Sequence, residues 1–254
     1  MKKILIVGGA NGIGLSIALQ LVKRPETEKI HIVDKVKLNE EYHHEKISSY
    51  QFDLCSSDYS IFDKFSDIDS LIITAGFGRI ALFEDVPEKM ISTYFEVNAI
   101  APIRIIKHFY DKLLSSNDFY CGVMVSIAGY MSSPFFSIYG ATKASLRIFI
   151  ESVNVELEKS GSTNRILNVS PGRIKGTSFY NEKSNLSQTI PMAQDIIHAM
   201  EEKSDLLIPQ YENVYKEVLE RYHTDFRAEG RHSYEYKINS GRVTIKNKKE
   251  NPSQ

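Results

Sequence analysis

Three glycines that follow an apolar segment place the strongest constraint on how this chain can fold. Gly8, Gly12 and Gly14 come directly after the segment 4–7 and stand before an apolar-periodic stretch that begins at Leu15. Glycine has no Cβ, so the backbone amides of such a turn can approach a pyrophosphate at the positive end of a helix. A glycine trio alone also fits a simple tight turn, but a strand before it and a helix after it favour a dinucleotide site.

Short β-branched segments alternate with longer amphipathic segments along most of the chain. We expect strands at 3–8, 29–34, 47–53, 69–75, 119–127, 165–170 and 205–209, and helices at 15–22, 87–114, 137–160, 191–203 and 211–222. This alternation is typical of parallel strands joined by crossover helices. The sequence therefore predicts an α/β fold with a doubly wound parallel sheet, that is, a Rossmann fold of three α/β/α layers.

The size of the chain suits one domain. A length of 254 residues with 42% hydrophobic and 25% charged residues can bury a single sizeable core. We therefore assign residues 1–222 to one Rossmann-type catalytic domain and residues 223–254 to a polar C-terminal extension.

Two segments without a clear period are expected to be irregular. Residues 173–190 are rich in Ser, Asn, Gly and Lys, which predicts a substrate-covering loop that Pro191 closes at a helix start. In the extension we expect a hairpin at 237–246 around Asn239-Ser240-Gly241 and disorder at 247–254.

Charge, cysteine content and the N-terminus narrow the function class. A formal net charge of -1 argues against binding nucleic acid through a general basic field. Cys55 and Cys121 are too few for a disulfide framework or a metal site. The apolar run after Met1 stops at Gly8, too soon for a signal peptide or a membrane span. We expect a cytoplasmic protein that acts on small molecules, with no nucleic-acid or membrane partner.

An acidic residue at the end of the second expected strand bears on the choice between NAD and NADP. Asp34 lies 20 residues beyond Gly14. A carboxylate there accepts hydrogen bonds from ribose hydroxyls and repels a 2′-phosphate, so NAD is favoured over NADP. Lys35 and Lys37 follow closely and soften this preference, so NADP is not excluded, and Asn11 adds no positive charge to the glycine turn.

A serine, a tyrosine and a lysine form the expected catalytic group. Tyr139 and Lys143 stand four residues apart in a helical pattern, which puts both on one helix face. Tyr42 and Lys46 share this spacing in a connector without an upstream strand-end serine, so the pair alone is weak evidence. Ser126, 13 residues before Tyr139 and near the end of an expected strand, makes the trio specific.

The trio suits acid–base chemistry at a carbonyl carbon. A free phenol has a pKa of about 10. An ammonium about 4 Å away interacts with a phenolate by about 4 kcal/mol at an effective dielectric of roughly 20, which brings the phenol toward working range. Ser126 would hydrogen-bond the substrate oxygen while Tyr139 transfers its proton, and hydride would pass between the substrate carbon and nicotinamide.

With these residues, the chain resembles the short-chain dehydrogenase/reductase family in its single-domain branch, over about residues 3–210. The resemblance implies an oxidoreductase acting on CH–OH groups, with Asn98 as a proton-relay residue beside Ser126, Tyr139 and Lys143. It also implies a homodimer or homotetramer. The coenzyme contacts expected are Gly8, Asn11, Gly12, Ile13, Gly14, Asp34, Asp53, Leu54, Ala75, Gly76, Tyr139, Lys143, Pro171, Gly172, Ile174 and Thr177.

The chain also departs from the family pattern. Val7 replaces the usual Thr before the first glycine, and Ile73-Thr74 replaces a pair of Asn. The Thr that commonly stands five residues past the proline is Gly176 here, and Thr177 follows it. These departures put the polar contacts around the coenzyme in question more than the chemistry.

The substrate is less constrained than the reaction. Arg173 and Lys175, with Tyr180 beside them, favour a polar anionic carbonyl compound such as a sugar phosphate. Solvated surface charge is the competing explanation for these cations. Aromatic residues such as Phe136 and Phe179 are also compatible with an acyl or ring substrate, as in a 3-oxoacyl-type reductase.

Two other functions share part of this pattern. A nucleotide-sugar epimerase would have a different glycine spacing and a longer substrate-binding half. A regulatory protein that senses NAD without turnover would not need the catalytic group. No metal is expected, because His43 and His44 lack a third ligand at suitable spacing.

Overall fold

The computed structural model describes residues 1–177, 179 and 184–243. Seven parallel strands form one sheet in the order β3-β2-β1-β4-β5-β6-β7. The strands are β1 (Lys3–Val7), β2 (Lys29–Asp34), β3 (Ile47–Gln51), β4 (Ser70–Ile73), β5 (Tyr120–Met124), β6 (Ile166–Val169) and β7 (Leu206–Leu207). Strand order reverses between β1 and β4, the point at which doubly wound sheets bind ligands beyond the carboxyl ends of their strands. The predicted fold class is confirmed.

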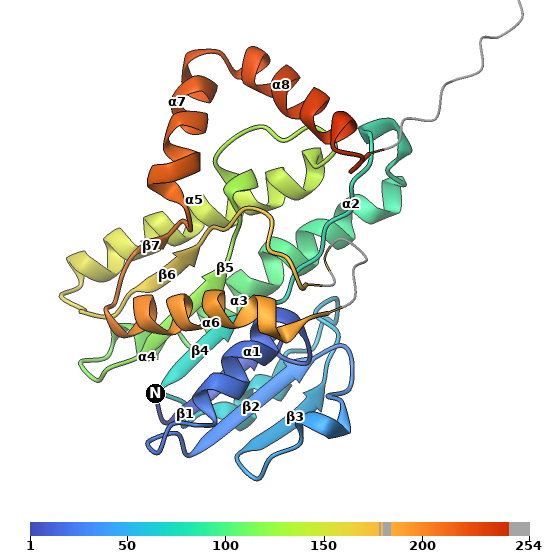
Figure 1. Ribbon diagram of the computed structural model, residues 1–254. Helices are drawn as coiled ribbons and strands as arrows, with labels where there is room; N and C mark the ends of the chain where they lie inside the picture. Colours follow the sequence, from blue (N-terminus) through green and yellow to red (C-terminus); the bar gives the residue numbers. More distant parts are fainter. Residues whose placement is uncertain (178, 180–183, 244–254) are drawn as a thin grey trace, which may run out of the picture.

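Helices cover both faces of the sheet (Figure 1). The helices are α1 (Gly12–Leu21), α2 (Glu88–Phe95), α3 (Ala101–His108), α4 (Tyr110–Leu114), α5 (Ser137–Lys159), α6 (Leu186–Glu201), α7 (Lys216–Thr224) and α8 (Phe226–Asn239). One apolar core lies between the sheet and α3 with α5, and a second lies between the sheet and α1 with α6. Neighbouring strand residues alternate between these cores: Leu5 and Val7 belong to the first, Ile4 and Ile6 to the second. This is the pattern of strands buried on both faces.

The predicted helix 87–114 is wrong as a single element. It consists of α2, a π-helical turn at Glu96–Ile100, then α3 and α4. The helix breaks at Phe109, where φ is -100° and ψ is 14°. An apolar period survives both interruptions, so periodicity alone cannot reveal them.

The predicted start of the helix at Pro191 is also wrong. Helix α6 begins at Leu186, because the side chain of Asn185 accepts a hydrogen bond from the Ser187 amide and caps the helix. Pro191 therefore lies inside the helix, on its exposed side. The carbonyl of Ser187, which loses its helical partner there, also belongs to an exposed residue.

The predicted hairpin in the C-terminal extension is wrong as well. Helix α8 runs through Asn239, and Asp225 caps its start by accepting hydrogen bonds from the Arg227 and Ala228 amides. Gly241, expected in a hairpin turn, has φ +70° and follows the end of the helix. Its amide donates to the Ile238 carbonyl at 2.9 Å, a helix-ending bond. The expected disorder at 247–254 lies outside the described residues.

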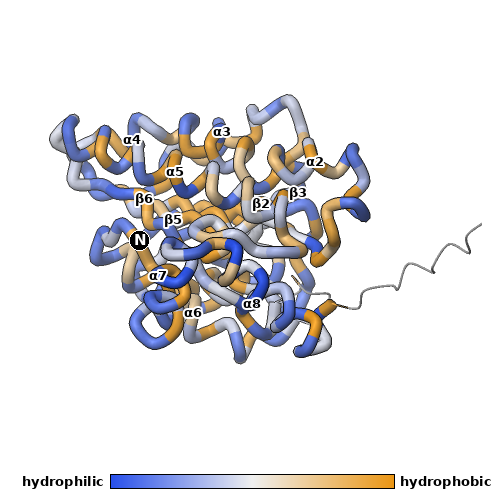
Figure 2. The backbone as a smooth tube through the Cα atoms, turned by 90° about the horizontal axis from the view of Figure 1, so that it is seen from above, coloured by the Kyte–Doolittle hydropathy of each residue, from blue (hydrophilic) through white to orange (hydrophobic). Residues whose placement is uncertain are grey.

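Helices α7 and α8 lie beyond the ends of the central strands (Figure 1). Seen from above, α3 and α4 lie on one side of the strands and α6 on the other, with α7 and α8 toward the viewer (Figure 2). No helix in the described part of the chain is long and apolar enough to cross a membrane.

Candidate active site

A cavity of about 760 Å³ extends from the glycine turn, across the ends of β4, β5 and β6, to α7 and α8. Its position matches the point where the strand order reverses. Three separate parts of the chain form its walls: the turns after the strands, the start of α5, and the C-terminal helices.

Two glycines of the turn, Gly8 and Gly14, have no room for a side chain. Gly8 has φ +90°, and a Cβ built on it would lie 2.4 Å from the amide nitrogen of Ala75. A Cβ on Gly14 would lie 2.4 Å from the Gly8 carbonyl oxygen and 2.5 Å from Thr74 Oγ1. Thr74 Oγ1 itself donates to the Gly8 carbonyl at 2.9 Å. The threonine that departs from the family pattern thus joins β4 to the glycine turn.

Asp34 holds the glycine turn at the end of β2. Its carboxylate accepts hydrogen bonds from the Ala10 amide at 2.9 Å and the Val36 amide at 3.1 Å. The neighbouring Lys35 turns toward Asp53 instead, with Nζ 2.8 Å from Oδ2. Their hydrogen bond lowers the pKa of Asp53 and raises the pKa of Lys35. No salt bridge joins Asp34 to a cation among the described residues.

Ser126 stands at the junction between β5 and the turn after β6. Its hydroxyl accepts a hydrogen bond from the Ala128 amide at 3.1 Å and donates to the Pro171 carbonyl at 3.4 Å. The side chain is almost fully buried, but it lines the cavity. Its partner Pro171 belongs to the turn expected beside the nicotinamide.

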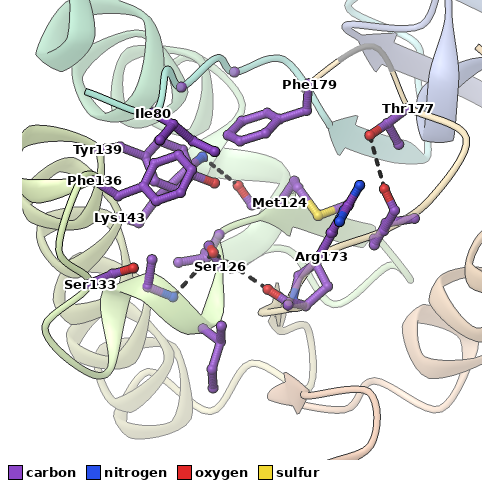
Figure 3. Close-up of a pocket in the computed structure, with 18 of the residues that line it drawn as sticks. Ile80, Met124, Ser126, Ser133, Phe136, Tyr139, Lys143, Arg173, Thr177 and Phe179 are labelled. Atoms are coloured by element: carbon purple, nitrogen blue, oxygen red, sulfur yellow. Dashed lines mark hydrogen bonds between the residues drawn. The ribbon is translucent and has the colours of Figure 1, made fainter. Parts of the chain in front are cut away.

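Tyr139 and Lys143 lie on the first turns of α5 and face the same cavity (Figure 3). Lys143 Nζ lies 5.8 Å from the centroid of the Tyr139 ring. Only 2% of Lys143 is exposed, and its ammonium donates to the Met124 carbonyl at 2.9 Å. Burial lowers the pKa of Lys143 to about 7.

Asn98 lies behind the cavity, in the π-helical turn. Its side-chain oxygen accepts from the Phe77 amide at 2.9 Å, and its amide donates to the Phe77 carbonyl at 2.9 Å and to Thr142 Oγ1 at 3.3 Å. A Cβ on Gly76 would lie 3.2 Å from Asn98 Oδ1 and 3.4 Å from Lys143 Nζ. Gly76 therefore keeps a narrow space between these two polar groups.

Two aromatic rings pack against Tyr139. Phe179 meets Tyr139 edge to face with 5.2 Å between ring centroids, and Phe136 lies 5.7 Å from Tyr139. A Cβ on Gly78 would lie 2.6 Å from the Phe179 ring, so Gly78 allows this ring to pack there. The rings of Phe136 and Phe179 thus give Tyr139 an apolar border on one side.

The structure brings most of the expected site residues to one cavity. The lining includes Gly8, Asn11, Gly12, Ile13, Gly14, Gly76, Ser126, Tyr139, Lys143, Pro171, Gly172, Arg173, Ile174 and Thr177. Other expected residues lie outside the lining, namely Asp34, Asp53, Leu54, Ala75, Asn98 and Lys175. Tyr180 lies outside the described residues.

Sequence reasoning missed the residues that the C-terminal helices contribute. Val214, Val218, Ser233 and Lys237 line the cavity from α7, α8 and the turn before them. The four-residue spacing of Val214 with Val218 and of Ser233 with Lys237 could have indicated shared helix faces. Nothing in the sequence indicated that those faces meet the active site.

Within residues 1–177, 179 and 184–243, no group of three or more His, Cys, Asp or Glu side chains could hold a metal ion.

Comparisons with known proteins agree with this geometry. The sequence pattern described as "short chain dehydrogenase" matches residues 2–188. An uncharacterized oxidoreductase of Saccharomyces cerevisiae is 26% identical over 231 residues, 83% of this chain and 74% of the yeast protein. Human retinol dehydrogenase 8 is 25% identical over 169 residues, 61% of this chain and 54% of the human protein.

Solved structures show the same fold at low sequence identity. A short chain dehydrogenase from Burkholderia cenocepacia, in complex with NADP, has a TM-score of 0.74 and 19% identity, with 91% of this chain and 97% of that chain covered. A short-chain dehydrogenase from Streptomyces avermitilis has a TM-score of 0.71 and 19% identity, with 96% of this chain and 100% of that chain covered. With the family pattern matched over most of its length, this chain belongs to the short-chain dehydrogenase family of oxidoreductases.

Proposed function

We propose that this enzyme transfers hydride between a nicotinamide coenzyme and a secondary alcohol or ketone, with Tyr139 as the acid–base residue. The observation that carries this proposal is the shared cavity, which Ser126, Tyr139 and Lys143 line together with the glycine turn. A non-catalytic NAD sensor would need the turn but not the other three groups.

The residues at the glycine turn fit a nicotinamide dinucleotide. Cβ atoms on Gly8 and Gly14 would meet backbone atoms at 2.4 Å, so only glycine lets the turn pack this closely at the start of α1, where helix amides can bind a pyrophosphate. Asn11, Ile13, Ala75, Ile174 and Thr177 would complete the coenzyme contacts, while Asp53 and Leu54 would lie at the adenine. When bound, the coenzyme supplies or accepts the hydride.

Ser126, Tyr139 and Lys143 would divide the proton chemistry between them. The Ser126 hydroxyl, anchored between Ala128 and Pro171, would orient the substrate oxygen. Tyr139 would give its proton to that oxygen during reduction and take it back during oxidation. The Lys143 ammonium would favour the phenolate form through its charge. Asn98, held by Phe77 and Thr142, would help to relay protons through water.

We infer that NAD is the preferred coenzyme. The support is Asp34, whose carboxylate is not paired with Lys35, because Lys35 binds Asp53. An uncompensated carboxylate at this position repels a 2′-phosphate. The NADP found in the Burkholderia cenocepacia relative keeps NADP as the alternative.

The substrate proposed is an anionic carbonyl compound, of which a sugar phosphate is one member. Arg173 lines the cavity just beyond Gly172 and supports this choice, whereas Lys175 is exposed outside the lining. A 3-oxoacyl-type substrate is the second candidate, because Phe136, Val214 and Val218 give the cavity apolar walls.

Three further parts of the proposal concern the whole protein. We propose a catalytic domain at 1–222 with an extension at 223–254, and a cytoplasmic location. We also propose a homodimer or homotetramer. Ile148 and Val155, 54% and 56% exposed on the outer side of α5, support contact with a second copy.

The test uses NADH or NADPH with a panel of ketones and oxo acids, and follows absorbance of the reduced nicotinamide. Tyr139→Phe is expected to lower kcat by about 10²-fold or more while NADH binding, followed by fluorescence, is retained. Tyr42→Phe is the matched control, because Tyr42 has the same spacing to a lysine far from the cavity. Coenzyme binding without turnover of any compound would favour the sensor, and undiminished turnover by Tyr139→Phe would overturn the proposed role.

A further inference from the structure

The C-terminal wall of the cavity carries an excess of positive charge. Arg221, Lys237 and Arg242 line this wall, and Glu229 is the one carboxylate among the described lining residues. Glu229 is already bound, because Arg221 Nε donates to its Oε2 at 2.8 Å. The wall therefore keeps two cations without a carboxylate partner in the described part of the chain.

Lys237 is the buried member of this pair. It is only 8% exposed, and its ammonium donates to Ser133 Oγ at 3.0 Å, to the Pro134 carbonyl at 3.0 Å and to Ser233 Oγ at 2.9 Å. All three acceptors are neutral, so the hydrogen-bonding capacity of the ammonium is used but its charge is not compensated. Burial and the charge of Arg242 lower the pKa of Lys237 to about 8, which leaves it mostly protonated at neutral pH.

Two serine hydroxyls beside Lys237 can donate hydrogen bonds to an anion. Each hydroxyl uses a lone pair to accept from Lys237, so its own proton points away from the ammonium. Ser133 and Ser233 both line the cavity, and neither hydroxyl donates to another group within the described residues. An anion in the cavity would accept one hydrogen bond from each serine hydroxyl, and the charge of Lys237 would strengthen both bonds.

An apolar stretch separates this wall from the catalytic tyrosine. Lys237 Nζ lies 5.9 Å from the Phe136 ring centroid, and that ring lies 5.7 Å from the Tyr139 ring. The ammonium is therefore no more than about 12 Å from the Tyr139 ring. Met131 and Val218 also line the cavity. A ligand that reaches both ends needs an apolar body between its carbonyl and its anionic group.

We propose that Lys237, Ser133 and Ser233 form a carboxylate-binding subsite, and that the substrate is an amphiphilic oxo or hydroxy acid whose carboxylate lies several bonds from the reacting carbon. This inference rests on the proposed oxidoreductase function for its reacting carbon, but the subsite itself requires only the chain. The subsite would favour such acids over sugar phosphates, which are polar throughout. It would also favour them over 2-oxo acids, in which the carbonyl and the carboxylate are adjacent.

The test measures binding of octanoate and octanamide to the purified full chain, with and without NADH, by calorimetry. The two probes share their apolar body and differ in charge. Octanoate is expected to bind the unaltered protein more tightly than octanamide. Lys237→Met is expected to weaken octanoate binding by about 10- to 100-fold and to change octanamide binding by no more than about twofold. Lys237→Arg keeps the charge and is expected to retain most of the preference.

Arg231→Met is the matched control, because Arg231 is an exposed cation on the same helix that does not line the cavity. Equal binding of the two probes to the unaltered protein would overturn the proposal. So would an undiminished octanoate preference in a folded Lys237→Met variant, or an equal loss in Arg231→Met. The probes are not turned over, so failure of the oxidoreductase assay with octanoate preference intact would refute the reaction and leave the subsite standing.

Discussion

Replacing Lys143 by methionine is expected to stabilise the protein without coenzyme while abolishing turnover. Burial holds the pKa of Lys143 at about 7, against 10.5 in solvent. At about 1.4 kcal/mol per pKa unit, keeping this side chain charged in the folded state costs about 5 kcal/mol. Methionine fills a similar volume without charge but leaves the Met124 carbonyl without its donor, which costs about 1–3 kcal/mol.

The net gain below pH 7 is therefore about 2–4 kcal/mol in the free energy of unfolding. Its pH dependence follows from the direction of the pKa change. Between pH 7 and 10.5 the unfolded state binds the Lys143 proton more strongly than the folded state, so the wild-type protein gains stability as pH rises. Lys143→Met lacks this gain, and its advantage should shrink by about 3 kcal/mol from pH 6 to pH 9.

Urea unfolding of both proteins at pH 6 and pH 9, without coenzyme, measures this difference. Lys159→Met is the control, because Lys159 is an exposed lysine at the other end of α5 and should change stability by less than about 0.5 kcal/mol at either pH. A Lys143→Met protein that is no more stable than wild type at pH 6, or whose advantage does not change with pH, would refute the assignment of an uncompensated buried charge.

Three other outcomes are expected. Gly8→Ala should abolish coenzyme binding in calorimetry and destabilise the fold by about 2–4 kcal/mol, because its Cβ would lie 2.4 Å from the Ala75 nitrogen. Gly161→Ala is the control, because Gly161 also has a positive φ but open space around it, and this variant should keep coenzyme binding. Asp34→Ala should lower the KM for NADPH relative to NADH by about tenfold, and an unchanged ratio in steady-state kinetics would contradict its role in coenzyme choice. Burial lowers the pKa of His31, so the stability linked to its neutral form is complete above pH 6.5 and is lost as pH falls through the folded pKa. His31→Phe should therefore reduce the change of the urea-unfolding midpoint with pH between pH 7 and 5. An unchanged pH dependence of the midpoint would contradict this.

The sequence predicted the fold well, because its signals are local. All seven expected strands overlap observed ones, and the central strands β1, β4 and β6 are apolar segments buried on both faces, which leave a clear trace in composition. The glycine turn, Ser126, Tyr139 and Lys143 were also identified from spacing, and the structure brings them to one cavity. Their catalytic roles stay predictions for the experiments above.

The elements that were predicted wrongly lie where two local signals compete, a helix cap with a proline and a helix end with a hairpin turn. The Asn185 side chain caps α6 and starts the helix before Pro191. The prediction instead placed the helix start at Pro191, because proline is common at the first position of a helix. The hairpin expected at Asn239-Ser240-Gly241 is a helix end, because a glycine at positive φ serves either structure. Packing decided it: Tyr234 of α8 stacks on Phe135 with 4.6 Å between ring centroids.

Gly172 leaves room for Tyr215 where the turn after β6 meets the segment that leads into α7. A Cβ on Gly172 would lie 1.6 Å from Tyr215 Oη, so a side chain at this position would displace the tip of Tyr215. Gly172 flanks the expected nicotinamide site, and α7 leads directly into the helix that carries Lys237. The bare backbone at position 172 therefore lets the turn after β6 and the segment before α7 line one cavity together.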